Sequence, residues 1–132
     1  MKKKVIWIID DDTIYQTIIN KLIQKSGVFS THSSFMNGKE AITTLNNTLG
    51  SNEDNIPDII LLDINMPIMD GWEFMEEIKR IKSKINKQII IYIVSSSIAI
   101  EDKNKSKTFT DIIGYIPKPI SIKDLLAIVD SK

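Results

Sequence analysis

Polar side chains that could bind a divalent cation or a phosphoryl group occur at four places in this sequence. They are the acidic run of Asp10, Asp11 and Asp12, the pair Asp63 and Asn65, the serines that begin at Ser95, and Lys118 between two prolines. Carboxylate oxygens are the ligands that Mg²⁺ prefers. An ammonium group and a hydroxyl can neutralise and hydrogen bond phosphoryl oxygens. Together these residue types predict the chemistry of a divalent cation and a phosphate.

Each group alone has a simpler structural explanation. An acidic run is typical of a solvated turn, an aspartate after a strand often caps a helix, and serines often cap the next one. A lysine before a proline is usually exposed. Only their common position at the ends of predicted strands favours a functional site.

The elements that must position these groups follow from two alternating hydrophobic periods. Short apolar runs without polar alternation predict buried strands at residues 5–9, 59–62, 89–94 and 112–116, with a weaker, more polar strand at 28–34. Helical spacing of apolar residues predicts five helices, at about 14–26, 38–49, 72–85, 98–109 and 122–129. Their inward positions are expected to be Ile14, Ile18, Leu22, Ile23, Ala41, Ile42, Leu45, Trp72, Met75, Ile78, Ile81, Ile85, Ile122, Leu125, Leu126 and Val129. Residues 46–57 and 65–71 are expected to be loops.

Strict alternation of strands and helices predicts the α/β class, with a doubly wound five-stranded parallel sheet that has helices on both faces. In such sheets, ligands bind at the carboxyl ends of the strands. All four polar groups follow predicted strands, so they are expected to meet at one edge. Asp63 could then act as a nucleophile towards phosphorus, while a cation, Lys118 and Ser95 stabilise the phosphoryl oxygens.

Composition excludes several other classes. The 132 residues suit one domain, expected to span residues 1–132. Seventeen basic and seventeen acidic residues cancel, which argues against a nucleic acid or membrane partner. The absence of cysteine and the single histidine exclude disulfides and multi-histidine metal sites. Three lysines after Met1 resemble the start of a signal peptide, but the acidic run interrupts the apolar core it would need. We therefore expect a cytoplasmic protein.

Four sequence segments, in this order, resemble a known family. They are Ile8-Ile9-Asp10-Asp11-Asp12, Leu61-Leu62-Asp63-Ile64-Asn65-Met66-Pro67-Ile68-Met69-Asp70-Gly71, Val94-Ser95-Ser96 and Tyr115-Ile116-Pro117-Lys118-Pro119. The sequence resembles the receiver domain of a two-component response regulator, of the chemotaxis-type single-domain kind, over residues 4–129. The resemblance implies a flavodoxin-like (βα)5 fold with strand order 2-1-3-4-5.

The resemblance also implies a phosphoryl acceptor and a Mg²⁺ site. Asp63 matches the aspartate that accepts the phosphoryl group. Asp11 matches the direct Mg²⁺ ligand, and Asp10 matches the acidic residue that holds the ion largely through water. Asn65 matches the residue whose backbone carbonyl binds the metal.

The remaining matched positions belong to the family's switch. Ser95 matches the hydroxyl that moves towards the phosphoryl group, and Tyr115 matches the aromatic residue that then turns inward. Lys118 matches the lysine that pairs with a phosphoryl oxygen, and its bond to Pro119 is typically cis in the family. Asp12 has no fixed role there, and we interpret it as a favourable charge at a helix N-terminus.

The implied function is a bacterial signalling module that catalyses only its own phosphorylation and dephosphorylation. It takes a phosphoryl group from a sensor histidine kinase and then binds an output protein, or, as a phosphorelay intermediate, passes the group to a histidine phosphotransfer protein. The readout face is expected over residues 98–109, 112–116 and 122–129, and it includes Glu101, Lys103, Lys105, Lys107, Tyr115, Lys123 and Asp124. The chain is expected to be a monomer, or a weak dimer through this face.

Two other kinds of protein use similar residues after a strand. A haloacid-dehalogenase-like phosphatase also uses an aspartate after a strand, but Asp63-Ile64-Asn65 lacks the second aspartate that serves as its acid and base. A flavodoxin-like cofactor binder needs a phosphate loop after the first strand. The carboxylates of Asp10, Asp11 and Asp12 would repel a phosphate there.

Overall fold

Strands and helices alternate along the chain in a computed structural model that describes residues 3–51, 53–96 and 99–130. The elements are β1 (Lys4–Ile9), α1 (Thr13–Ser26), β2 (Phe29–Phe35), α2 (Gly38–Thr48), β3 (Ile59–Leu62), α3 (Gly71–Ile81), β4 (Ile90–Ser95), α4 (Ile100–Ser106), β5 (Ile112–Pro117) and α5 (Ile122–Asp130), with 3-10 turns at Glu53–Asn55 and Lys82–Lys84. None of these helices is long and apolar enough to cross a membrane.

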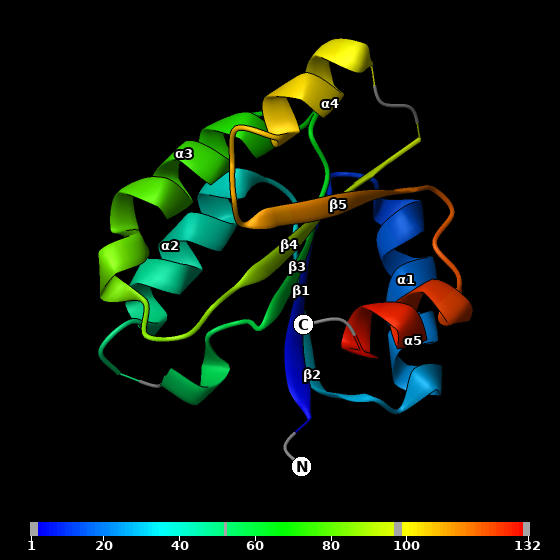
Figure 1. The fold of residues 1–132 in the computed structure, drawn as a ribbon. Coiled ribbons are helices and arrows are strands. Elements are labelled where there is room, and N and C mark those ends of the chain that lie inside the picture. Colours follow the sequence, from blue (N-terminus) through cyan, green and yellow to red (C-terminus); the bar gives the residue numbers. More distant parts are fainter. Residues whose placement is uncertain (1–2, 52, 97–98, 131–132) are drawn as a thin grey trace.

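The five strands form one parallel sheet in the order β2-β1-β3-β4-β5. Helices α1 and α5 cover one face, and α2 and α3 cover the other (Figure 1). This arrangement confirms the predicted doubly wound fold and its strand order. The carboxyl ends of all five strands therefore lie along one edge, where the predicted site residues follow them.

The central strands β1 and β3 are buried on both faces of the sheet, where successive side chains of a strand point to opposite sides. In β1, Val5, Trp7 and Ile9 pack in the core beneath α2 and α3, whereas Ile6 and Ile8 pack beneath α1 and α5. All five side chains are at most 7% exposed. This double burial explains why β1 and β3 are continuous apolar runs rather than alternating ones.

Side-chain caps fix where α1 and α3 begin. Asp12 accepts the Tyr15 N–H at 3.0 Å and is the N-cap of α1. Asp12 therefore precedes the first helical residue, and its side chain accepts a hydrogen bond from the backbone of α1. The sequence predicted only a favourable charge at this helix terminus. Asp70 caps α3 in a capping box with Glu73, which fixes the end of the loop that follows β3.

The helix faces differ from the prediction in α1 and α5. Ile14 and Ile18 are 73% and 51% exposed, and the buried positions of α1 are Tyr15, Gln16, Ile19 and Ile23. The buried face of α1 is rotated from the predicted one, because Gln16 donates hydrogen bonds to backbone carbonyls at the ends of β1 and β2 and must face inward. In α5, Leu126 is 42% exposed, and Leu125 and Ile128 form the buried pair.

Helix α2 ends at Thr48, one residue before the predicted end at 49, so residues 46–48, which both the predicted helix and the predicted loop included, are helical. Two other helix boundaries differ from the prediction. Helix α3 ends at Ile81, because the chain tightens into a 3-10 turn, although Ile85 still packs on the core as the apolar spacing indicated. Helix α4 is shorter than residues 98–109 suggested. Ser97, the last of the serines that follow Val94, and Ile98, the predicted start of this helix, lie outside the described residues.

Candidate functional site

The register of β1 and β3 brings two predicted aspartates together. Ile9 and Leu62 are paired neighbours in the sheet, and Asp10 and Asp63 are the residues that follow them. The Asp63 N–H donates to the carbonyl of Ile9 at 2.9 Å, which extends the strand pairing to the site. Asp10 and Asp63 thus leave adjacent strands at the same level, and Asp11 follows in the chain.

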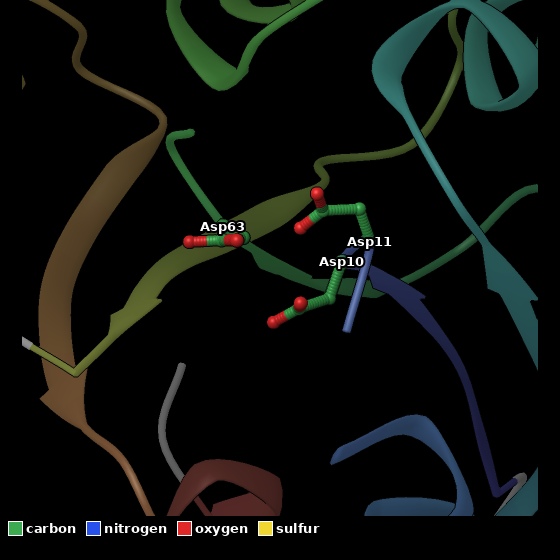
Figure 2. A group of neighbouring side chains, drawn as sticks. All are labelled: Asp10, Asp11 and Asp63. Atoms are coloured by element: carbon green, nitrogen blue, oxygen red, sulfur yellow. The ribbon is translucent and has the colours of Figure 1, made fainter. Parts of the chain in front are cut away.

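Three carboxylates converge at this edge of the sheet. One oxygen each of Asp10, Asp11 and Asp63 lies within 4.8 Å of the other two (Figure 2). Asp10 and Asp63 are only 1% and 9% exposed, whereas Asp11 is exposed to solvent. Solvent therefore reaches the cluster from the side of Asp11, whereas Asp10 and Asp63 are enclosed by protein.

Burial and mutual repulsion make this cluster costly when it is fully ionised. Burial, followed by the charge of Asp10, raises the pKa of Asp63 to about 6. Burial also raises the pKa of Asp10, although Lys118 opposes this shift. Three hard oxygen donors with an excess of negative charge fit a divalent cation such as Mg²⁺, which would relieve the repulsion.

Backbone N–H groups fix the two buried carboxylates. Oδ1 of Asp10 accepts the Asp12 N–H, and Oδ1 of Asp63 accepts the Ile64 N–H, both at 2.9 Å. Behind Asp63 the first residue of α3 approaches closely, and a Cβ atom on Gly71 would lie 2.5 Å from the Asp63 carbonyl oxygen. Only glycine allows α3 to begin so near the site.

Lys118 contributes the positive charge of the site. Its Nζ lies 2.8 Å from Oδ2 of Asp10, and its backbone N–H donates to the Ser95 carbonyl at 2.9 Å. The peptide bond between Lys118 and Pro119 is cis, as the resemblance implied. Ser95 pairs with Pro117 across β4 and β5, so the structure places Ser95 and Lys118 side by side at this edge.

Two predicted residues lie apart from the carboxylate cluster. Tyr115, on β5, is 45% exposed, and Lys103 Nζ of α4 lies 4.7 Å from the centre of its ring. Its ring thus lies on the outer surface. Asn65 lies in the loop two residues beyond Asp63, and its side chain is exposed.

Sequence reasoning missed two residues of α1 that contact the site. The buried Gln16 donates from Nε2 to the carbonyls of Asp10 and Phe35 at 3.0 and 3.1 Å, which ties the ends of β1 and β2 together. The ring of Tyr15 lies beneath Lys118, whose Nζ is 4.5 Å from the ring centre. A helix that begins directly after the acidic run places its first turn over the site, and this was the available signal.

The comparison with protein-family models identifies the family. A model described as the response regulator receiver domain matches residues 6–130. The chain belongs to the response regulator receiver domain family. Receiver domains act in two-component signalling, generally as signalling modules rather than catalysts, and they bind Mg²⁺ at an acidic pocket.

Relatives of known sequence or structure agree with this receiver fold. The DNA-binding transcriptional regulator NtrC of Salmonella typhimurium is 28% identical over 130 residues, which are 98% of this chain and 25% of the relative. The receiver domain thus spans about a quarter of the length of the NtrC proteins it matches. A two-component response regulator from Cytophaga hutchinsonii superposes with a TM-score of 0.85 at 27% identity, covering 97% of this chain and 95% of that one.

A third similar structure carries a metal ion. The receiver domain of the sensor histidine kinase PA1611 from Pseudomonas aeruginosa has a magnesium ion coordinated in its active site cleft. It superposes with a TM-score of 0.74 at 20% identity, covering 96% of this receiver domain and 94% of that chain. At this identity the likeness shows the shared fold.

Proposed function

We propose that this chain is a phosphorylation-activated receiver that accepts a phosphoryl group on Asp63 from the phosphohistidine of a sensor kinase. The observation that carries the proposal is the convergence of Asp10, Asp11 and Asp63 at one strand edge, with Lys118 paired to Asp10. Of the three carboxylates, Asp63 is the buried one that lacks a direct ion pair with Lys118, which acts on it through its charge.

The transfer uses the oxygen of Asp63 that the backbone leaves available. Oδ1 accepts the Ile64 N–H, so Oδ2 attacks phosphorus as the P–N bond of the phosphohistidine breaks. The bonding electrons leave with the imidazole nitrogen, which takes up a proton. In the product, the Lys118 ammonium and the Ser95 hydroxyl stabilise the phosphoryl oxygens.

The acidic cluster supplies the ligands for Mg²⁺ in this proposal. Asp11, Asp63 and the backbone carbonyl of Asn65 would bind it directly, and Asp10 would hold it through water. When bound, Mg²⁺ neutralises phosphoryl charge and offsets the repulsion between the carboxylates.

Phosphorylation would act as a switch because it adds about one negative charge and new acceptor oxygens at Asp63. Ser95 moves towards this charge, and the ring of Tyr115 leaves its exposed position for the space that Ser95 vacates. The contact of Tyr115 with Lys103 is then lost, so the surface of α4, β5 and α5 changes its shape. A partner that prefers the new surface shifts the equilibrium towards it.

The proposed partners follow from this cycle. A cytoplasmic sensor histidine kinase donates the phosphoryl group, and the changed surface binds an output protein or a second copy of the chain in a weak dimer. As an alternative within the same function, Asp63 passes the group to a histidine phosphotransfer protein. Residues 1–132 would act as one receiver domain that catalyses only its own phosphorylation and dephosphorylation.

Intact mass after incubation with phosphoramidate tests the proposal. We expect one added phosphoryl group in the presence of Mg²⁺, no adduct in excess EDTA, and no adduct in Asp63→Asn. Asp70→Asn is the matched control, because an asparagine keeps the N-cap of α3 and should leave uptake unchanged. Full uptake by Asp63→Asn would overturn the assignment.

A further inference from the structure

The ammonium group of Lys118 has two partners in this structure. One is Oδ2 of Asp10 at 2.8 Å, and the other is the ring of Tyr15, whose centre lies 4.5 Å from Nζ. The Lys118 side chain is only 17% exposed, so water screens neither contact well. An ammonium group over an aromatic face is attracted by the ring, and the attraction grows as water is removed.

Tyr15 is suited to serve as a rigid platform. Its side chain is 8% exposed, and it packs in the core formed by β1, α1 and α5. Burial and the charges of Asp10, Asp63 and Asp12 raise the pKa of its hydroxyl, which therefore keeps its proton and leaves the ring neutral. Within the described part of the chain, this hydroxyl has no hydrogen-bond partner. The contact with Lys118 thus depends on the ring rather than on the hydroxyl.

We propose that Tyr15 is a positioning residue whose ring holds Lys118 at Asp10 in the resting protein and so opposes its transfer to phosphorylated Asp63. The inference rests on the proposed function, because it concerns the same lysine and the same acceptor. Once Asp63 carries a phosphoryl group, the ammonium is drawn towards the larger negative charge. Leaving the ring then costs the cation–π contact, and this cost lowers the stability of the activated state.

The inference predicts opposite behaviour for two substitutions. Tyr15→Phe keeps the ring and loses only the hydroxyl, so it should behave like the wild type. Tyr15→Leu removes the ring while filling the site with an apolar side chain, so Lys118 should leave Asp10 more readily. Tyr15→Met is a second ring-free variant of similar size, and it replaces Tyr15→Leu if that protein does not fold.

Equilibrium binding of beryllofluoride, a mimic of the phosphoryl group, provides the measurement. With saturating Mg²⁺, titration calorimetry should give about three- to tenfold tighter binding for Tyr15→Leu, as expected for the loss of one shielded cation–π contact. Binding by Tyr15→Phe should stay within about twofold of the wild type. Unchanged or weaker binding by both ring-free variants would overturn the inference, and so would a Tyr15→Phe protein that behaves like Tyr15→Leu.

A second readout tests the contact itself. The ring current of Tyr15 should shift the ε-methylene protons of Lys118 upfield in the wild type and in Tyr15→Phe, and the shift should vanish in Tyr15→Leu. A wild-type protein that takes up no phosphoryl group from phosphoramidate would contradict the proposed function. A wild type that is phosphorylated, beside ring-free variants with unaltered beryllofluoride affinity, would contradict only the role of Tyr15.

Discussion

The indole N–H of Trp72 donates a hydrogen bond to Oδ1 of Asp102 at 3.2 Å, and this bond joins the first turn of α3 to α4. The same indole stacks on Phe109 at a centroid distance of 6.1 Å, and Lys105 Nζ lies 5.4 Å from its centre. Helix α4 itself contributes no buried residue. The position of α4 therefore depends largely on Trp72, which lies in the first turn of α3, close to Asp63 in the fold.

Loss of this bond should loosen α4 without unfolding the sheet. We expect Asp102→Ala to raise amide hydrogen exchange across residues 100–106 and to lower stability by about 1 kcal/mol, the usual worth of one such bond. Exchange in β1 and β3 should stay unchanged. Asp102→Asn keeps an acceptor oxygen and serves as the control, so equal exchange in both variants would contradict this role.

Neutralising Asp63 should stabilise the metal-free fold at neutral pH. Its pKa is raised from 3.8 to about 6, so the folded state binds a proton that the unfolded state has lost between these values. The stabilising contribution of the proton is complete below pH 3.8 and is lost as the pH rises through about 6.

Asp63→Asn removes this loss of folding stability at high pH, because asparagine does not ionise. In EDTA at pH 8 the variant should be more stable than the wild type, by up to about 3 kcal/mol, and the difference should vanish near pH 4. Thermal unfolding at both pH values provides the measurement. A variant that is less stable at pH 8 would show that the carboxylate is not strained by its surroundings.

Charge alone should not decide Mg²⁺ affinity. Asp11 lies in the carboxylate cluster, whereas Asp12 is the cap of α1 and is absent from it. We expect Asp11→Asn to weaken Mg²⁺ binding at least about tenfold, since the proposed direct ligand would change from a charged carboxylate oxygen to a neutral amide oxygen. Asp12→Asn keeps the cap and removes the same charge at longer range, and about a twofold loss is expected. Equal losses in a calorimetric titration would count against Asp11 as a direct ligand.

The close approach of α3 behind Asp63 should make Gly71 intolerant of any side chain. A Cβ atom there would meet the Asp63 carbonyl oxygen at 2.5 Å, so one backbone must move. We expect Gly71→Ala to cost about 3 kcal/mol in urea unfolding, near the upper end of overpacking. Gly114→Ala is the control, because its nearest neighbour would be an ordinary 3.6 Å away. Similar stabilities of the two variants would refute the close contact.

Gln16 should be as important for stability as an apolar core residue. Gln16→Leu leaves the carbonyls of Asp10 and Phe35 without this donor, and such losses cost about 1–3 kcal/mol. Gln24→Leu changes an exposed position on the same helix and should be nearly neutral. If urea unfolding gives the same midpoint for both, Gln16 does not hold the strand ends.

The sequence predicted the sheet well because buried parallel strands leave a simple pattern. Ile59–Leu62 is a strand with the predicted bounds, and all four residues are buried. Alternating buried strands and helices predict a doubly wound sheet, but such sheets occur with more than one strand order, and the order 2-1-3-4-5 came from the resemblance to receiver domains. The carboxylate cluster could be predicted because Asp10, Asp11 and Asp63 all follow predicted parallel strands, whose carboxyl ends share one edge of the sheet.

The prediction was weaker where a polar residue decides the packing. Ile14 and Ile18 gave a regular apolar stripe, but the buried face of α1 includes Gln16, whose amide is satisfied by strand carbonyls. A hydropathy pattern counts glutamine as a surface residue and therefore misses this face. The contact between Tyr15 and Lys118 depends on the same rotation of α1 and on the turn that follows β5. A hydropathy pattern contains neither feature, so this contact could be found only in the structure.

Because Asp10 and Asp63 directly follow paired residues of β1 and β3, the length of these strands is more constrained than their composition. Inserting or deleting one residue in either strand would turn its aspartate to the opposite face of the sheet, whereas exchanging one aliphatic residue for another would not. The connection around Glu53–Asn55 lies at the other end of β3. A peptide tag or reporter domain inserted there would lengthen the chain without shifting the two aspartates, and this makes it the natural site for building a sensor from the protein.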